Sequence, residues 1–167
     1  ARASHHTGRS DVLAQEFLDR FGAGGFVVAL HLDGDGVALL DLWQPEKGSR
    51  RILEKYGKGE EKLPVFKMPH LRGWSMAAGR AWLPAIGRHE VLMADADTWR
   101  ETGRVAVKGQ PVFVMASPDG RQIWVNFAFP DNGWVQVIDT LSGKVVQTLQ
   151  PGKAVLHMEF TPRGEAV

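Results

Sequence analysis

Cysteine is absent from the 167-residue sequence. This absence excludes disulfide bonds, thiolate metal ligands and a cysteine nucleophile within the chain. An excess of either charge is also missing, because 20 Lys and Arg face 19 Asp and Glu, for a formal net charge of +1. A chain without a basic surplus is not expected to bind nucleic acid. Apolar runs stay below the roughly 18 residues of a membrane helix, and no signal-peptide pattern is visible, so we expect no membrane span.

Motifs of self-contained catalysis are missing as well. The chain has no Gly-rich phosphate loop, no His-x-x-x-His type of metal spacing and no Ser-His-Asp arrangement. Helical periodicity is confined to one stretch, Ser10 to Phe21, which begins near a possible N-cap at Asp11 and is expected to form a helix. The sequence therefore does not indicate an enzyme that is complete within this chain.

A repeat with a period in the forties is present. Three short apolar runs end in Asp41, Asp95 and Asp139, and the last two lie 44 positions apart. The turn sequence Ser117-Pro-Asp-Gly120 recurs at the same spacing as Thr161-Pro-Arg-Gly164. A period of this length with four strands per unit is typical of β-propeller blades. The repeat therefore predicts an all-β fold.

The number of repeats predicts a fragment of a ring. The expected blades cover residues 25–66, 67–108 and 109–150, and a fourth begins at 151–167. Because closed propellers have about four to eight blades, we expect residues 24–167 to be part of a larger propeller, and we leave residues 1–23 unassigned. Trp82 and Trp124 recur at matching positions, so we expect them to pack between blades. Trp74 is expected in the core rather than stacked on a ligand.

Propeller geometry predicts where a ligand would bind. The connections between blades and the hairpins between strands 2 and 3 lie on one face, and the other turns lie on the opposite face. Strand 1 lines the central channel, and ligand pockets commonly form where such loops converge. The candidate ligand-binding residues on this face are His70, Arg72, Arg88, His89, Gln110, Lys153 and His157.

These candidates differ in the chemistry they offer. His70, after Pro69 at the start of a strand 1, is suited either to ligate iron or to hydrogen-bond a neighbouring carbonyl. Arg72, Arg88 and Lys153 are suited to bind carboxylates, although hairpin charges such as Arg88 and His89 are often only solvated. His157 is expected to point either into the channel or into the core between blades.

Several longer stretches carry a more specific resemblance. They are Gly36–Gly48, Gly59–Pro64, Lys67–Leu71, Ala85–Val91, Gly109–Met115 and Pro151–Phe160. In this order they resemble the heme d1 biosynthesis protein F family of nitrite-reductase operons, from about residue 24 to the end. Met68-Pro-His-Leu71 and Gly109-Gln-Pro-Val-Phe113 are specific, because blade geometry does not require them. That family is similar to the d1 domain of cytochrome cd1 nitrite reductase, an eight-bladed propeller that binds heme d1 over its channel.

The resemblance implies a periplasmic protein of denitrification that binds heme d1, or a d1-type precursor, while this cofactor matures. It implies that His70 approaches the iron and that Arg72 and Arg88 meet the carboxylates. Two roles stay open: an oxidoreductase acting on a heme d1 precursor, and a non-catalytic propeller that carries heme d1 or scaffolds partners such as other maturation proteins or nitrite reductase. Nitrite reduction is disfavoured, because a second distal-side His has no counterpart near Ala116-Ser117. Without the family's earlier blades, the chain alone is expected to be inactive.

Overall fold

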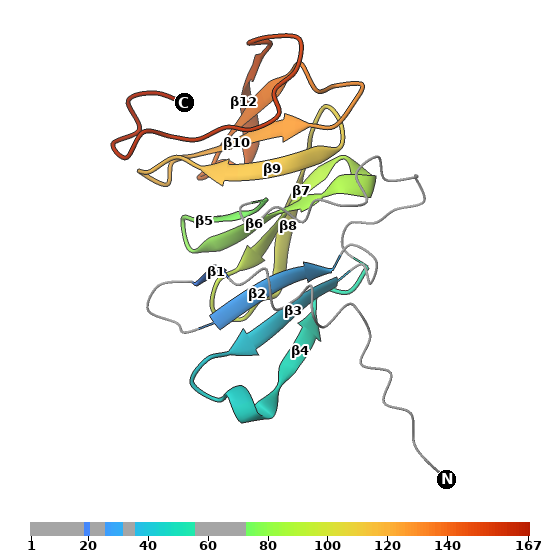
Figure 1. Ribbon diagram of the computed structural model, residues 1–167, viewed down its shortest axis with the longest axis vertical. Helices are drawn as coiled ribbons and strands as arrows, with labels where there is room; N and C mark the ends of the chain where they lie inside the picture. Colours follow the sequence, from blue (N-terminus) through green and yellow to red (C-terminus); the bar gives the residue numbers. More distant parts are fainter. Residues whose placement is uncertain (1–18, 21–25, 32–35, 56–72) are drawn as a thin grey trace.

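The computed structural model describes residues 19–20, 26–31, 36–55 and 73–167, and these residues form β-sheets (Figure 1). Their strands make three four-stranded antiparallel sheets, and in each sheet the strands follow one another in chain order from one edge to the other. The described residues contain no α-helix. The prediction of an all-β fold built from four-stranded blades is therefore confirmed.

The three sheets are consecutive segments of the chain. The first contains β1 (Asp19–Arg20), β2 (Phe26–His31), β3 (Gly36–Asp41) and β4 (Ser49–Ile52). The second contains β5 (Ser75–Ala77), β6 (Arg80–Ala85), β7 (Glu90–Asp95) and β8 (Glu101–Ala106). The third contains β9 (Pro111–Ala116), β10 (Gln122–Phe127), β11 (Val135–Asp139) and β12 (Lys144–Leu149). Short 3-10 helices, η1 (Pro45–Lys47) and η2 (Ile86–Arg88), interrupt two of the turns.

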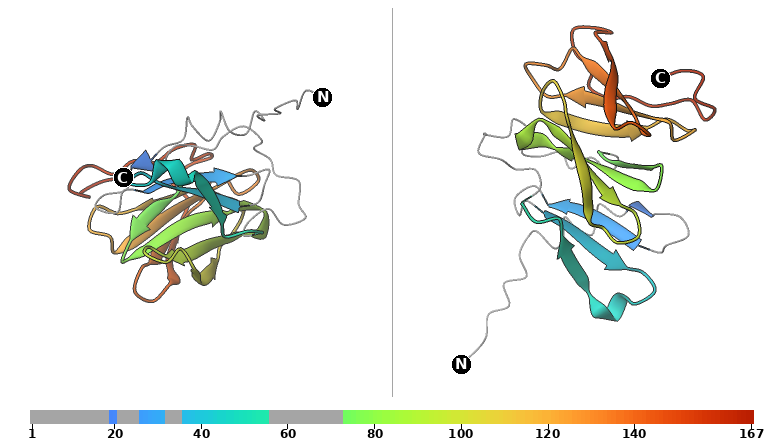
Figure 2. Two further views of the ribbon diagram at one scale, coloured as in Figure 1. Left: turned by 90° about the horizontal axis from the view of Figure 1, so that it is seen from below. Right: turned by 180° about the vertical axis from the view of Figure 1, so that it is seen from behind.

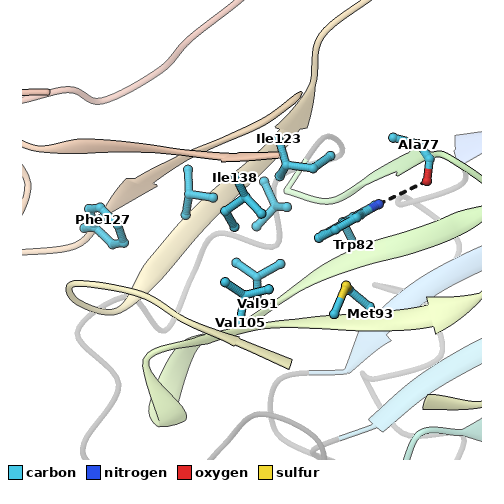
Figure 3. Packing of buried hydrophobic residues seen from close by; sticks show 10 residues of the cluster. Ala77, Trp82, Val91, Met93, Val105, Ile123, Phe127 and Ile138 are labelled. Carbon is cyan, nitrogen blue, oxygen red and sulfur yellow. Dashed lines mark hydrogen bonds between the residues drawn. The ribbon is translucent and has the colours of Figure 1, made fainter. Parts of the chain in front are cut away.

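The sheets stack face to face along the long axis of the molecule, as Figures 1 and 2 show. Successive side chains of a strand point to opposite faces. In β6, Leu83 therefore joins the core between the first and second sheets, whereas Trp82 joins the core between the second and third sheets (Figure 3). Leu92 and Val91 of β7 divide in the same way. The second sheet is consequently buried on both faces.

Two of the three tryptophans that were expected to pack in a core lie in the cores between the sheets. Trp82 is fully buried, and its Nε1–H donates a hydrogen bond to the carbonyl oxygen of Ala77 at 3.1 Å (Figure 3). Trp74 is also buried, edge-on to Trp99 with the ring centroids 6.5 Å apart. Both predictions of core packing are confirmed for these two residues. Trp124 was also expected to pack between blades, but it is half-buried and makes an edge contact at 5.7 Å with Phe160 of the C-terminal segment rather than with a neighbouring sheet.

The repeated Asp residues close the turn after the third strand of each sheet. Asp95 Oδ1 accepts hydrogen bonds from the backbone N–H and the hydroxyl of Thr98, at 2.8 and 2.7 Å. Asp139 Oδ1 accepts the equivalent pair from Ser142, at 2.7 and 2.6 Å. The hydroxyl hydrogen bond is the main reason why the pKa of each carboxyl lies below its usual value. The periodicity of Asp thus reflects turn structure.

The N-terminal part differs from the expectation. Asp19–Arg20 forms β1, which pairs antiparallel with β2, so the predicted helix over Ser10–Phe21 is wrong at these residues. The remainder of that stretch lies outside the described residues. The first sheet also begins before residue 24, where we placed its boundary. Backbone pairing with the edge of β2 is a tertiary effect, and such effects override weak helix propensity.

The C-terminal part also differs, because residues 151–167 contain no strand. The segment instead crosses the open face of the third sheet, beside β9 and β10 in Figure 1. It is held there by a backbone hydrogen bond from Val155 to Asn132, by burial of Met158 and by the contact between Phe160 and Trp124. A strand requires a paired neighbour, and none of the described strands pairs with this segment. The first strand expected for a fourth blade is therefore absent, and residues 151–167 form an irregular segment that packs on the third sheet.

Candidate ligand-binding face

Hydrogen bonds join the loops on the predicted ligand side of the sheets. We call this the connection face; it consists of residues 86–89, 107–110, 128–134 and 150–155. The backbone N–H of Val107 donates to the carbonyl of His89 at 2.9 Å, and that of Ala128 donates to the carbonyl of Gln110 at 2.9 Å. The N–H of Val155 donates to the carbonyl of Asn132 at 2.6 Å. The face is therefore one connected surface across the second and third sheets.

Of the candidate ligand-binding residues near the second sheet, the structure describes Arg88 and His89. His70 and Arg72 lie outside the described residues, so their placement stays a prediction. Arg88 is exposed at the end of η2, and its charge acts on Glu101 of the outer strand β8. His89 is half-buried and adopts a left-handed backbone conformation with φ of 53°, which turns the chain into β7. The positive charge of Arg88 therefore helps to lower the pKa of Glu101 at the edge of the second sheet.

The predicted residues of the third sheet lie on or near the connection face. Gln110 is half-buried directly before β9, and Lys153 is exposed in the segment after β12. The ring of His157 lies edge-on to Phe113 with centroids 5.1 Å apart, and its Nε2 lies 3.2 Å from Glu159 Oε1. His157 is exposed, so its edge contact with Phe113 does not decide between the channel and the core, and both alternatives stay predictions. Binding of a ligand by these residues stays a prediction.

A cation on the connection face escaped the sequence reasoning. The ammonium group of Lys108 lies 4.7 Å from the ring centroid of Trp134 and 3.6 Å from Asp131 Oδ1. The backbone N–H of Lys108 donates to Gln136 Oε1 at 2.9 Å. These contacts tie the connection before β9 to the hairpin before β11. The one sequence feature that could have indicated Lys108 is its position directly before the Gly109-Gln-Pro motif.

Gly109 lets this connection approach the hairpin closely. A Cβ atom at this position would lie 2.6 Å from Asp131 Oδ2, which is shorter than side chains tolerate. Only glycine fits without a shift of Asp131, and this accounts for one residue of the motif that blade geometry alone does not require.

A buried amide also escaped the sequence reasoning. Asn126 is only 1% exposed. Its Oδ1 accepts a hydrogen bond from the N–H of Phe113 at 3.0 Å, and its Nδ2 donates to the carbonyl of Val155 at 2.9 Å. Within the sequence, Asn126 reads as an ordinary polar position of a strand, so no local pattern could identify it.

Ion pairs occupy the rim of the second sheet. Arg104 contacts Glu101 at 2.8 Å and Glu90 at 3.0 Å. The hydrogen bond to Glu101 is the largest cause of the raised pKa of Arg104, and the same bond lowers the pKa of Glu101, with a smaller effect from Arg88. Arg104 thus forms ion pairs with both carboxylates of this rim, which agrees with a structural role.

Metal-binding and membrane features can be assessed for the described part of the chain. There, no three His, Asp or Glu side chains gather in a way that could hold a metal ion. The same residues include no helix with the length and apolarity that a membrane crossing requires. A hollow of about 310 Å³ lies on the opposite face, between the Ser117–Asp119 turn and residues 160–167. It contains none of the predicted site residues.

Residues 25–167 match the family model of the cytochrome D1 heme domain. The chain belongs to this family. It is 56% identical to Protein NirF of Pseudomonas aeruginosa over 144 residues. These aligned residues are 86% of this chain and 37% of that protein. It is 55% identical over 142 residues to Protein NirF of Stutzerimonas stutzeri, with 85% and 36% covered. The cytochrome D1 chain described here thus spans little more than a third of these relatives, and the resemblance found in its sequence is confirmed.

Solved structures confirm the propeller architecture of this family member. Dihydro-heme d1 dehydrogenase NirN in complex with DHE superposes with a TM-score of 0.61 at 18% identity, over 88% of this chain and 30% of that one. The β-propeller domain of Cps50 (Swd1) from Myceliophteria thermophila gives 0.55 at 12% identity, over 84% and 43%. At such low identities these likenesses concern the fold alone. The chain is a fragment of a β-propeller.

Proposed function

We propose that the chain forms part of the ligand-binding face of a protein that binds a heme d1-type tetrapyrrole in heme d1 biosynthesis. The observation that carries this proposal is the match of residues 25–167 to the cytochrome D1 heme domain, together with 56% identity to Protein NirF. Because the chain covers 37% of that relative, the rest of the site is expected to come from other blades.

The described donors suit such a ligand. A heme iron needs a single axial imidazole rather than a cluster of ligands, and the peripheral carboxylates of a tetrapyrrole need cations. The described part of the connection face has exposed cations at Arg88, Lys108 and Lys153, and His70 is the imidazole that we propose for the iron. The bound macrocycle would supply redox chemistry, while these side chains would bind and orient it.

Within this function we assign the iron-facing position to His70 and the carboxylates to Arg72 and Arg88, as the family resemblance implies. The protein would work in the periplasm, where other heme d1 maturation proteins or nitrite reductase would be its partners. Conversion of a heme d1 precursor by the purified protein would establish an oxidoreductase. Binding without conversion would establish a carrier.

An absorbance titration of the full-length protein tests the proposal. We expect a saturable spectral shift with heme d1 and a weaker response to ordinary heme. His70→Ala should change the Soret band of the complex, whereas Thr140→Val should leave it unchanged, because the Thr140 hydroxyl is buried against Gly120 on the opposite face. Absence of a shift with either tetrapyrrole would refute the proposed function. A Soret change in His157→Ala alone would move the iron ligand to that residue.

A further inference from the structure

We propose that Asn126 is a positioning residue of the ligand-binding face: its buried amide fixes the segment that carries Lys153 and His157 against β9. The part of this inference that concerns a ligand rests on the proposed function. The part that concerns the segment can be tested without any ligand.

The orientation of the Asn126 amide is determined by its partners. The N–H of Phe113 can only donate, so it must face Oδ1, and the carbonyl of Val155 can only accept, so it must face Nδ2. Both atoms are satisfied at good distances in a side chain that is 1% exposed. A buried amide with both ends used is costly to replace, because each lost partner leaves a desolvated polar group.

A bulge in the third sheet explains why an amide is needed at this position. Val125 of β10 pairs with Val114 of β9, but Phe127 pairs with Pro111, so two residues of β9 oppose Asn126 alone. Such a bulge disrupts the regular ladder of backbone hydrogen bonds. The side chain of Asn126 supplies an acceptor for the N–H of Phe113 at this irregularity.

The same side chain holds the segment after β12. Both polar backbone groups of Val155 are bound to the third sheet, the N–H by Asn132 and the carbonyl by Asn126. Lys153 lies two residues before this anchor and His157 two residues after it. The ring of His157 lies edge-on to Phe113. The Asn126 amide therefore binds the backbone of both Phe113 and Val155, the two residues that position His157.

Thr140 provides a matched control in the same sheet. It is the other buried polar side chain among the described residues, also 1% exposed. Its hydroxyl bonds to the carbonyls of Gly120 and Arg121, at 2.9 and 3.1 Å, on the face opposite the connection face. Thr140→Val therefore removes a comparable buried group from the third sheet without touching Val155.

Limited proteolysis of the full-length protein tests the anchoring. Trypsin cleaves after Lys153, two residues from the anchored Val155, so release of this residue should expose the site. We expect cleavage at Lys153 to become about tenfold faster in Asn126→Leu, as loss of a hydrogen bond implies. In Thr140→Val, cleavage at this site should stay at the wild-type rate. An unchanged rate in a folded Asn126→Leu variant would overturn the inference.

Asn126→Asp keeps the test decisive if the leucine variant does not fold. A carboxyl group can accept from Phe113 in either ionisation state, but it can donate to Val155 only when protonated. Relative to wild type at the same pH, heme d1 affinity of this variant should be nearly normal at about pH 5 and reduced at about pH 8. A variant-to-wild-type ratio that does not change with pH would contradict the role of the Nδ2 donor.

Titration with heme d1 tests the link to the ligand. We expect Asn126→Leu to weaken binding about tenfold and Thr140→Val to bind as wild type does. Faster cleavage at Lys153 with unchanged affinity would overturn the positioning role. Failure of the wild type itself to bind heme d1 would refute the proposed function and the ligand part of this inference, and the cleavage rates would still decide whether Asn126 fixes the segment.

Discussion

Replacing Trp82 with alanine is expected to destabilise the fold by about 3–5 kcal/mol. The indole lies fully buried between the second and third sheets, and its N–H is bonded to the carbonyl of Ala77. The substitution removes both contributions and leaves a cavity between the two sheets.

The magnitude follows from area and hydrogen bonding. A buried Trp removes roughly 150–250 Å² from water, which at about 25 cal/mol per Å² stabilises the fold by roughly 4–6 kcal/mol. The hydrogen bond to Ala77 contributes about 1 kcal/mol more. The alanine methyl group and partial collapse of the cavity recover part of this total. Trp82→Phe keeps most of the area and should cost about 1–2 kcal/mol.

Urea unfolding of the full-length protein, followed by circular dichroism, measures this cost as a change in the free energy of unfolding. Trp43→Ala is the control, because Trp43 is 77% exposed in the turn after β3 and its loss should change stability by less than about 0.5 kcal/mol. If Trp82→Ala costs no more than Trp43→Ala, the sheets do not stack through this residue and the reasoning is refuted.

Two further predictions concern the turns and the C-terminal segment. The hydrogen bond from Ser142 is the largest cause of the lowered pKa of Asp139, so its stabilisation is complete above the ordinary value of 3.8 and is lost as the pH falls through the lower folded value. Ser142→Ala should therefore make acid unfolding, followed by circular dichroism, less dependent on pH in that range, and an unchanged acid transition would contradict this. A Cβ at Gly133 would lie 2.9 Å from the backbone oxygen of Gly152, so Gly133→Ala should cost about 1–3 kcal/mol in urea unfolding. Gly152→Ala, whose Cβ would meet nothing within 4 Å, is the control; equal costs would show that close approach is not the cause.

The repeat could be read from the sequence because its marks are local. Asp95 and Asp139 each bond to a hydroxyl and an N–H three residues later, and such turns need particular residues at fixed offsets. The alternation of Trp82 and Leu83 between two cores follows equally from the geometry of one strand. Features that depend on neighbouring residues in the chain were therefore predictable.

The remaining features depend on contacts between distant residues. The helical pattern over Ser10–Phe21 gave no sign of the edge of β2, with which Asp19–Arg20 pairs. Asn126 is separated by 29 positions from Val155, and Lys108 by a hairpin from Trp134, so neither contact has a sequence pattern. The edge contact of His157 with Phe113 likewise joins residues that are far apart in the sequence, so no local pattern indicates it.

The pairing of strands only with their neighbours along the chain has a consequence for synthesis. Each sheet is complete once a single stretch of sequence is available, since β5 to β8, for example, need no partner from elsewhere for their ladder of hydrogen bonds. A ribosome releases the chain from its N-terminus at about 5–20 residues per second, and sheets of this kind can form in that order. Each new sheet then meets a finished surface on the one before it, so growth of the fold proceeds by addition to an existing face.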